Sequence, residues 1–154
     1  MAKFIYRMQN ILTLDEKLEE QAKMEYAAQQ VVLNEAEEEE EALKQRKVSY
    51  EEEARRLRGE KLNARDMALN ARAIDIMGDL ILEQHEIVKQ EEDKLEVKRS
   101  ALEEAMKDRK TQEKLKEKAF DDFKQELAME ESKQIDQLTS YTFGIKKQKA
   151  KAEG

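Results

Sequence analysis

Few side chains in this sequence have the types and spacing that catalysis or metal binding requires. The single histidine, His85, has no second histidine or cysteine near it, and a metal site needs several such ligands. No nucleophile stands at a suitable spacing from a base, and the four glycines are isolated rather than gathered in a phosphate-binding loop. We therefore predict no enzyme activity, no cofactor and no metal site, and we expect His85 to lie in a helix seam opposite Leu33.

The composition indicates what the chain builds instead of an active site. Charged residues make up 42% of the 154 residues, and the sequence has no proline and no cysteine. The charges are mixed with Ala, Leu, Met and Gln, which are good helix formers, and this mixture is typical of long coiled-coil helices. No apolar run is long enough to span a membrane, and the start of the chain is too polar for a signal peptide.

The charge is distributed unevenly along the chain. Residues 44–65 hold eight Lys or Arg against four Glu, and residues 145–154 hold four Lys against one Glu. The formal net charge of −7 nevertheless argues against nucleic-acid binding, and no aromatic residues are interleaved with the first basic group. We expect that group to form a basic tip, through which Arg55, Arg56, Arg58, Lys61 and Arg65 would bind an acidic partner surface. An ordinary solvated turn is the alternative.

A seven-residue repeat is the strongest structural signal in the sequence. Every seventh residue from Met67 is apolar, in the order Met67, Ile74, Ile81, Val88, Leu95 and Leu102. A weaker repeat precedes Gly59, and its phase differs from that of the first. The sequence therefore predicts an all-α fold, a long antiparallel two-helix coiled-coil hairpin that turns near Gly59.

The predicted boundaries follow from this turn. We expect one coiled-coil unit over residues 1–154, with helix one over about 4–57, a turn at 58–60, helix two over about 61–142, and a flexible basic tail over 144–154. In this register Tyr50 faces Met67 and Ala36 faces Ile81, although an error of one heptad stays open. A parallel homodimer of single unbroken helices is the rival, since one glycine inside a helix costs only about 1 kcal/mol.

The hairpin leaves the second helix longer than the first. In the predicted register Phe4 lies opposite Glu113, so Phe120, Phe123 and Leu127 have no partner within the chain. An exposed apolar stripe at a helix end is a candidate docking surface. The predicted surface comprises Phe4, Met8, Leu115, Phe120, Phe123 and Leu127.

Three stretches of the sequence resemble the flagellar FliJ family. They are FIYRMQNILTLDEKLEEQAKMEYA (Phe4–Ala27), RKTQEKLKEKAFDDFKQE (Arg109–Glu126) and EESKQIDQLTSYTF (Glu130–Phe143), and the Arg-Lys-x-x-Glu-Lys-Leu core of the second is the family's best signature. The resemblance implies a two-helix stalk of the flagellar type III export apparatus. It further implies binding to the hexameric export ATPase, to the cytosolic domain of the export gate and to export chaperones.

The resemblance also implies a cytoplasmic protein that is peripherally associated with the inner face of the cell membrane at the flagellar base. By analogy with rotary shafts, the end that carries both chain termini would enter the ATPase ring. A virulence-type stalk and a homodimeric scaffold stay open as alternatives.

Overall fold

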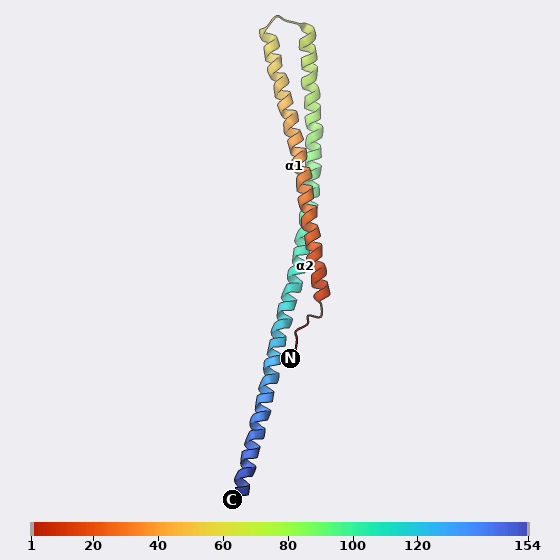
Figure 1. The fold of residues 1–154 in the computed structure, drawn as a ribbon. Helices are drawn as coiled ribbons and strands as arrows, with labels where there is room; N and C mark the ends of the chain where they lie inside the picture. The colour runs from red at the N-terminus through yellow and green to blue at the C-terminus, as the bar shows by residue number, and fades with distance from the viewer. Residues whose placement is uncertain (1, 154) are drawn as a thin grey trace. The chain divides into compact units, whose positions relative to one another are not determined.

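The computed structural model describes residues 2–153 and contains two helices, α1 (Gln9–Gly59) and α2 (Ala64–Glu153), with no strand in that range. The chain divides into two compact parts, which we call the hairpin part (Leu18–Met106) and the terminal part (Met1–Lys17 with Lys107–Gly154). Within each part the two chain segments lie side by side and run antiparallel (Figure 1). The predicted all-α, antiparallel two-helix fold is confirmed, and the rival of single unbroken helices is wrong.

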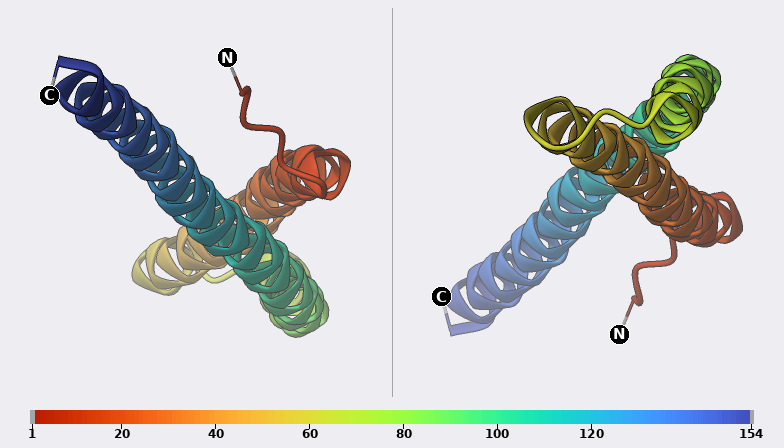
Figure 2. Two further views of the ribbon diagram at one scale, coloured as in Figure 1. Left: turned by 90° about the horizontal axis from the view of Figure 1, so that it is seen from below. Right: turned by 90° about the horizontal axis from the view of Figure 1, so that it is seen from above.

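The reversal of the chain occurs over residues 60–63, between Gly59 and Ala64 (Figure 2, right). The side-chain oxygen of Asn63 accepts hydrogen bonds from the backbone N–H groups of Arg65 (3.1 Å) and Asp66 (3.3 Å). This is the geometry of a helix N-cap, which satisfies amide groups that have no partner inside the helix. The predicted turn at 58–60 lies too early in the sequence, because Asn63, and not Gly59, determines where α2 begins.

The cap gives a first prediction. Replacing Asn63 with alanine is expected to lower the free energy of unfolding by about 1 kcal/mol, because two amides at the start of α2 lose their acceptor. Thermal unfolding followed by circular dichroism measures the loss. Asn63→Asp keeps an acceptor and is the matched control, and equal stability of the alanine and aspartate variants would contradict the assignment of the cap.

The seam of the hairpin part follows the coiled-coil alternation of three and four residues. On α1 the buried apolar side chains include Leu33, Ala36 and Leu43, and on α2 Val88 is buried. Leu33, Ala36 and Val88 form one cluster, against which Leu95 packs. The other members of the predicted α2 stripe are half-buried, which confirms that stripe as the face turned toward α1.

The predicted register is wrong by one heptad. Ala36 clusters with Val88, seven residues beyond the expected Ile81, and Phe4 packs against Phe120, seven residues beyond the expected Glu113. A shift of seven residues leaves every stripe in phase, so the alternation alone cannot select the register. Because the turn comes later in the sequence than predicted, residues of α1 pair with residues of α2 one heptad further along.

The position of His85 also differs from the expected one. Gln84, and not His85, reaches the seam and donates to the carbonyl of Ala36 (3.0 Å). His85 is half exposed instead, with Nδ1 3.1 Å from the Glu40 carboxylate, so its expected place opposite Leu33 is wrong. On α1, Glu19 is buried and Leu18 is exposed, so Glu19 and not Leu18 belongs to the buried face of this helix.

Both predicted outer ends of the helices need correction. Residues 2–6 are not helical, and α1 begins at Gln9, where the backbone N–H of Gln9 donates to the carbonyl of Tyr6 (3.1 Å). At the other end α2 continues through Gly144 to Glu153, so the expected flexible tail is helical over its described residues. The lysines after Gly144 are good helix formers, and Lys151 in the last turn complements the negative end of the helix dipole.

Candidate partner-binding surfaces

Phe120 and Phe123, which the sequence left without a partner, pack against Phe4. The ring centroids of Phe4 and Phe120 are 5.1 Å apart at an interplanar angle of 62°, and those of Phe4 and Phe123 are 5.6 Å apart at 49°. These are edge-on and tilted arrangements that aromatic pairs prefer. The expectation that the two rings have no partner within the chain is therefore wrong, and the one-heptad shift explains why, since it moves Phe4 from Glu113 to Phe120.

Polar contacts hold the same non-helical segment along α2. The hydroxyl of Tyr6 donates to the side-chain carbonyl of Gln112 (2.8 Å), and Tyr6 itself is buried. At the first residue of α1, the side-chain oxygen of Gln9 accepts a hydrogen bond from the ammonium of Lys116 (2.7 Å). Leu12 is buried one turn further on. Residues 4–12 thus form a clasp on α2, with the aromatic contacts at its outer end.

The clasp borders a groove of about 720 Å³ in the terminal part. Its walls come from residues 3–8 on one side and from Leu115, Ala119, Asp122, Phe123 and Glu126 of α2 on the other. Of the six predicted docking residues, Met8, Leu115 and Phe120 are 37–43% exposed, whereas Phe4, Phe123 and Leu127 are half-buried. Phe4, Met8, Leu115 and Phe123 line this groove, Phe120 packs against Phe4, and Leu127 lies one turn beyond Phe123 on α2.

The basic tip contains acidic partners as well as arginines. Arg56 pairs with Glu53 and with Glu60, where its Nη1 lies 3.0 Å from the carboxylate. The hydrogen bond to Glu53 raises the pKa of Arg56 and lowers the pKa of Glu53. Lys61 lies in the connection and Arg65 in the first turn of α2, and both are exposed. Part of the positive charge of the tip is therefore already compensated within the chain.

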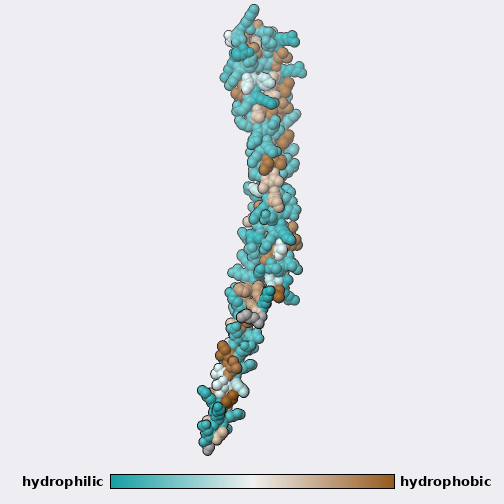
Figure 3. Space-filling view, viewed as in Figure 1, coloured by the Kyte–Doolittle hydropathy of each residue, from teal (hydrophilic) through white to brown (hydrophobic). Residues whose placement is uncertain are grey.

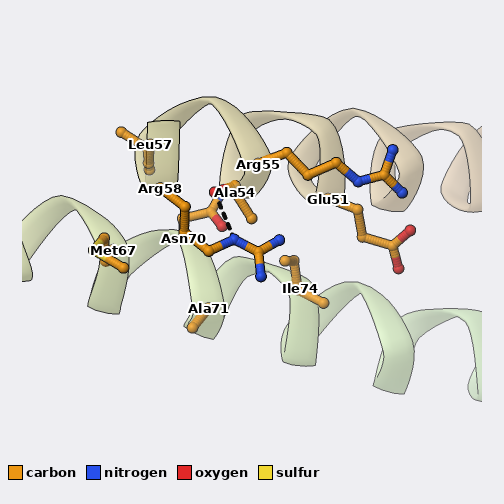
Figure 4. Close-up of a pocket in the computed structure, with 9 residues that line it drawn as sticks. All are labelled: Glu51, Ala54, Arg55, Leu57, Arg58, Met67, Asn70, Ala71 and Ile74. Atoms are coloured by element: carbon orange, nitrogen blue, oxygen red, sulfur yellow. Dashed lines mark hydrogen bonds between the residues drawn. The ribbon is translucent and has the colours of Figure 1, made fainter. Parts of the chain in front are cut away.

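A second groove, of about 430 Å³, lies between α1 and α2 just below the tip. Its lining combines the apolar side chains of Leu57, Met67 and Ile74 with the long side chains of Glu51, Arg55 and Arg58 (Figure 4). Arg58 donates from Nε to the carbonyl of Ala54 (3.3 Å). Arg55 and Arg58 thus lie beside apolar side chains, and the sequence did not reveal this groove, because it depends on the corrected register.

The polar seam is the other feature that sequence reasoning missed. Gln29 donates to the Glu91 carboxylate (2.5 Å), and this bond, followed by the one from Lys94, lowers the pKa of Glu91. A hydrogen bond from Lys44 is the main cause that lowers the pKa of Glu40. The Gln29–Glu91 bond joins α1 to α2 within the hairpin part, whereas the Lys94–Glu91 and Lys44–Glu40 pairs each lie within one helix. They do not resemble a reaction centre, and no group of side chains in residues 2–153 is arranged to hold a metal ion.

The family model for the flagellar FliJ protein matches residues 4–148. The chain belongs to this family. The match spans both helices and nearly the whole sequence, as the three sequence stretches predicted. Comparisons with curated proteins and with solved structures gave no match.

Membership of the FliJ family connects the chain with flagellar biogenesis and type III protein export. The family is a structural or adaptor family without catalytic activity. Neither described helix is long and apolar enough to cross a membrane.

Proposed function

We propose that the chain is a non-catalytic stalk of the flagellar export apparatus that binds the hexameric export ATPase and promotes its assembly. The family match over residues 4–148 is the observation that carries this proposal. The chain has long antiparallel helices of the kind a stalk requires. Binding that favours the assembled ring stabilises it by mass action, so a stalk needs no catalytic group.

The ATPase is proposed to bind at the clasp end, through Phe4, Met8, Leu115, Phe120, Phe123 and Leu127. Aromatic and long apolar side chains beside a groove are typical centres of binding energy in interfaces. Phe4 and Phe123 are held by ring contacts before any partner binds, so little side-chain entropy is lost on docking. The exposed Met8, Leu115 and Phe120 would then supply most of the new contact area.

The basic tip is proposed to contact the cytosolic domain of the export gate, and export chaperones are proposed as further partners. Arg55, Arg58, Lys61 and Arg65 are exposed, and Arg56 is in part neutralised by its two glutamates. Contact through such side chains mainly accelerates association and weakens as salt is added. The same contacts would keep the chain in the cytoplasm, peripherally associated with the inner face of the membrane at the flagellar base.

The test is co-purification with the flagellar export ATPase, with ring formation and ATPase rate as readouts. Replacing both Met8 and Leu115 with serine is expected to weaken binding at least tenfold, because two exposed apolar contacts are lost from the interface. Leu82→Ser is the matched control, since Leu82 is an exposed leucine of the hairpin part. Unchanged binding and ring formation in the double variant would overturn the assignment of this end. No stimulation by the wild-type chain would overturn the proposed function.

A further inference from the structure

The last 26 residues of α2 form a continuous helical segment. Every side chain described from 128 to 153 is exposed, and Ile135, Leu138, Tyr141 and Phe143 are 62–70% exposed. Figure 3 shows hydrophobic residues on the surface near the lower end of the molecule. Helices in water gain most of their stability from packing of an apolar face. This segment therefore presents a helix face whose stabilising partner lies outside the single chain.

The exposed face has the spacing of a coiled-coil seam. Ile135, Leu138, Thr142 and Ile145 follow one another at intervals of three, four and three residues. We call these four residues the C-terminal stripe. Three of them line a shallow groove of about 360 Å³ together with Thr139, Phe143 and Lys146. A narrow stripe at this spacing fits the matching stripe of another helix.

The charges on either side of the stripe have opposite signs. The acidic segment, residues 126–136, contains four acidic residues and one lysine, which gives −3. The basic segment, residues 144–153, contains four lysines and one glutamate, which gives +3. The two segments lie about equally far from residue 140. A helix with this pattern is complementary in charge to a second copy of itself when the two run in opposite directions.

We propose that the C-terminal stripe is a docking surface for the same stripe of a second copy of this chain, in antiparallel orientation. Pairing centred on residue 140 places Ile135 of one copy opposite Ile145 of the other, and Leu138 opposite Thr142. The same register places Glu131 opposite Lys149 at both ends of the apolar layers. A parallel pair would instead bring acidic segment to acidic segment, at an electrostatic cost.

An anionic membrane fits the same surface less well than a second copy does. The acidic segment would be repelled from a negatively charged bilayer. Met129 also lies on the side of the helix opposite Leu138, by the 100° rotation per residue of an α-helix. A helix that lies in a membrane interface gathers its apolar residues on one broad face, and this segment does not.

The pairing goes beyond the proposed function and does not rest on it. The pairing involves only the C-terminal part of α2, beyond the residues that contact the clasp. The full chain can be tested by itself, without any other protein. The sedimentation equilibrium of the full chain should show a reversible, concentration-dependent rise from 18.1 kDa to twice that mass. Raising the salt from about 0.1 M to about 1 M should shift the equilibrium toward monomer, because the Debye length falls from about 10 Å to about 3 Å.

Charge reversal tests the pairing and contains its own rescue. Replacing Lys146, Lys147, Lys149 and Lys151 with glutamate is expected to weaken self-association about tenfold or more, and replacing Glu130, Glu131 and Asp136 with lysine should do the same. A chain with both reversals regains charge complementarity and should self-associate like the wild type. All the substituted side chains are exposed, and circular dichroism checks that each variant keeps its helix content. Failure of the double reversal to restore association overturns the proposal.

Cross-linking tests the orientation, since the chain has no cysteine of its own. A mixture of Ile135→Cys and Ile145→Cys chains should be joined by a short bifunctional maleimide, whereas Ile135→Cys chains alone should not. Cross-links among Ile135→Cys chains alone would indicate a parallel pair and overturn the proposal. A chain that stays at 18.1 kDa at all concentrations would also overturn it, whether the segment then binds an ATPase ring, a lipid vesicle or neither.

Discussion

Replacing Leu33 with alanine is expected to lower the free energy of unfolding by about 2 to 3 kcal/mol. Leu33 is 5% exposed and packs with Ala36 and Val88 in the buried cluster of the hairpin part. The described residues include only six buried apolar side chains, so each carries a large share of a stability that is small in total. A two-helix seam relaxes more easily than a closed core, which keeps the expected loss at the low end for a buried leucine.

Urea unfolding followed by circular dichroism measures this loss, and Leu82→Ala provides the control. Leu82 is 70% exposed on α2, so its truncation removes the same atoms without emptying the seam. Its stability should stay within about 0.5 kcal/mol of the wild type. Equal losses in the two variants would mean that the position of Leu33 in the buried cluster contributes nothing specific.

The sequence was sufficient to predict the hairpin and the apolar stripe of α2. Six apolar residues at heptad spacing from Met67 require a partner helix, and the structure places that stripe against α1. The register was different, because a coiled coil repeats every seven residues and a slip of one heptad exchanges equivalent positions. Ala36 has an apolar residue opposite it in either register, at Ile81 or at Val88.

Two local features could have selected the register from the sequence. Asn63 is a preferred N-cap residue just before a run of helix formers, and its position moves the turn beyond Gly59. The later turn brings Phe4 to Phe120, which pairs aromatic with aromatic instead of leaving both alone. The polar seam offered no such signal, since the sequence gives little reason to prefer Gln84 over His85 at a helix interface.

The candidate docking end was found for a reason that proved partly wrong. The sequence identified Phe120 and Phe123 as unusual in a chain with four phenylalanines, and they do lie at one end of the clasp. It treated them as uncovered because the predicted register placed Phe4 opposite Glu113 and ended the first helix there. Non-helical chain spans a greater length per residue than a helix does, so Phe4 and Tyr6 contact α2 side chains beyond the start of α1.

Replacing Phe120 with alanine is expected to release the non-helical part of the clasp from α2 without unfolding the helices. Phe120 contributes an edge-on contact with Phe4, and the Lys124 ammonium lies 4.6 Å from the centroid of its ring. Losing the ring should favour local opening of residues 2–8 by about 1 to 2 kcal/mol, which raises the open population about five- to thirtyfold. The helix content should stay the same, because α2 keeps its own backbone hydrogen bonds.

Limited trypsin digestion reports this opening through the rate of cleavage after Arg7. Arg7 lies between the ring contacts of Phe4 and the start of α1, so a protease needs this segment to leave α2 before it can bind. Phe143→Ala is the matched control, since Phe143 is 70% exposed and its truncation should leave the rate unchanged. Phe120→Leu should fall between the two, because it keeps apolar area but loses the ring geometry. If Phe120→Ala were cleaved no faster than Phe143→Ala, Tyr6 and its bond to Gln112 would be sufficient to hold the clasp.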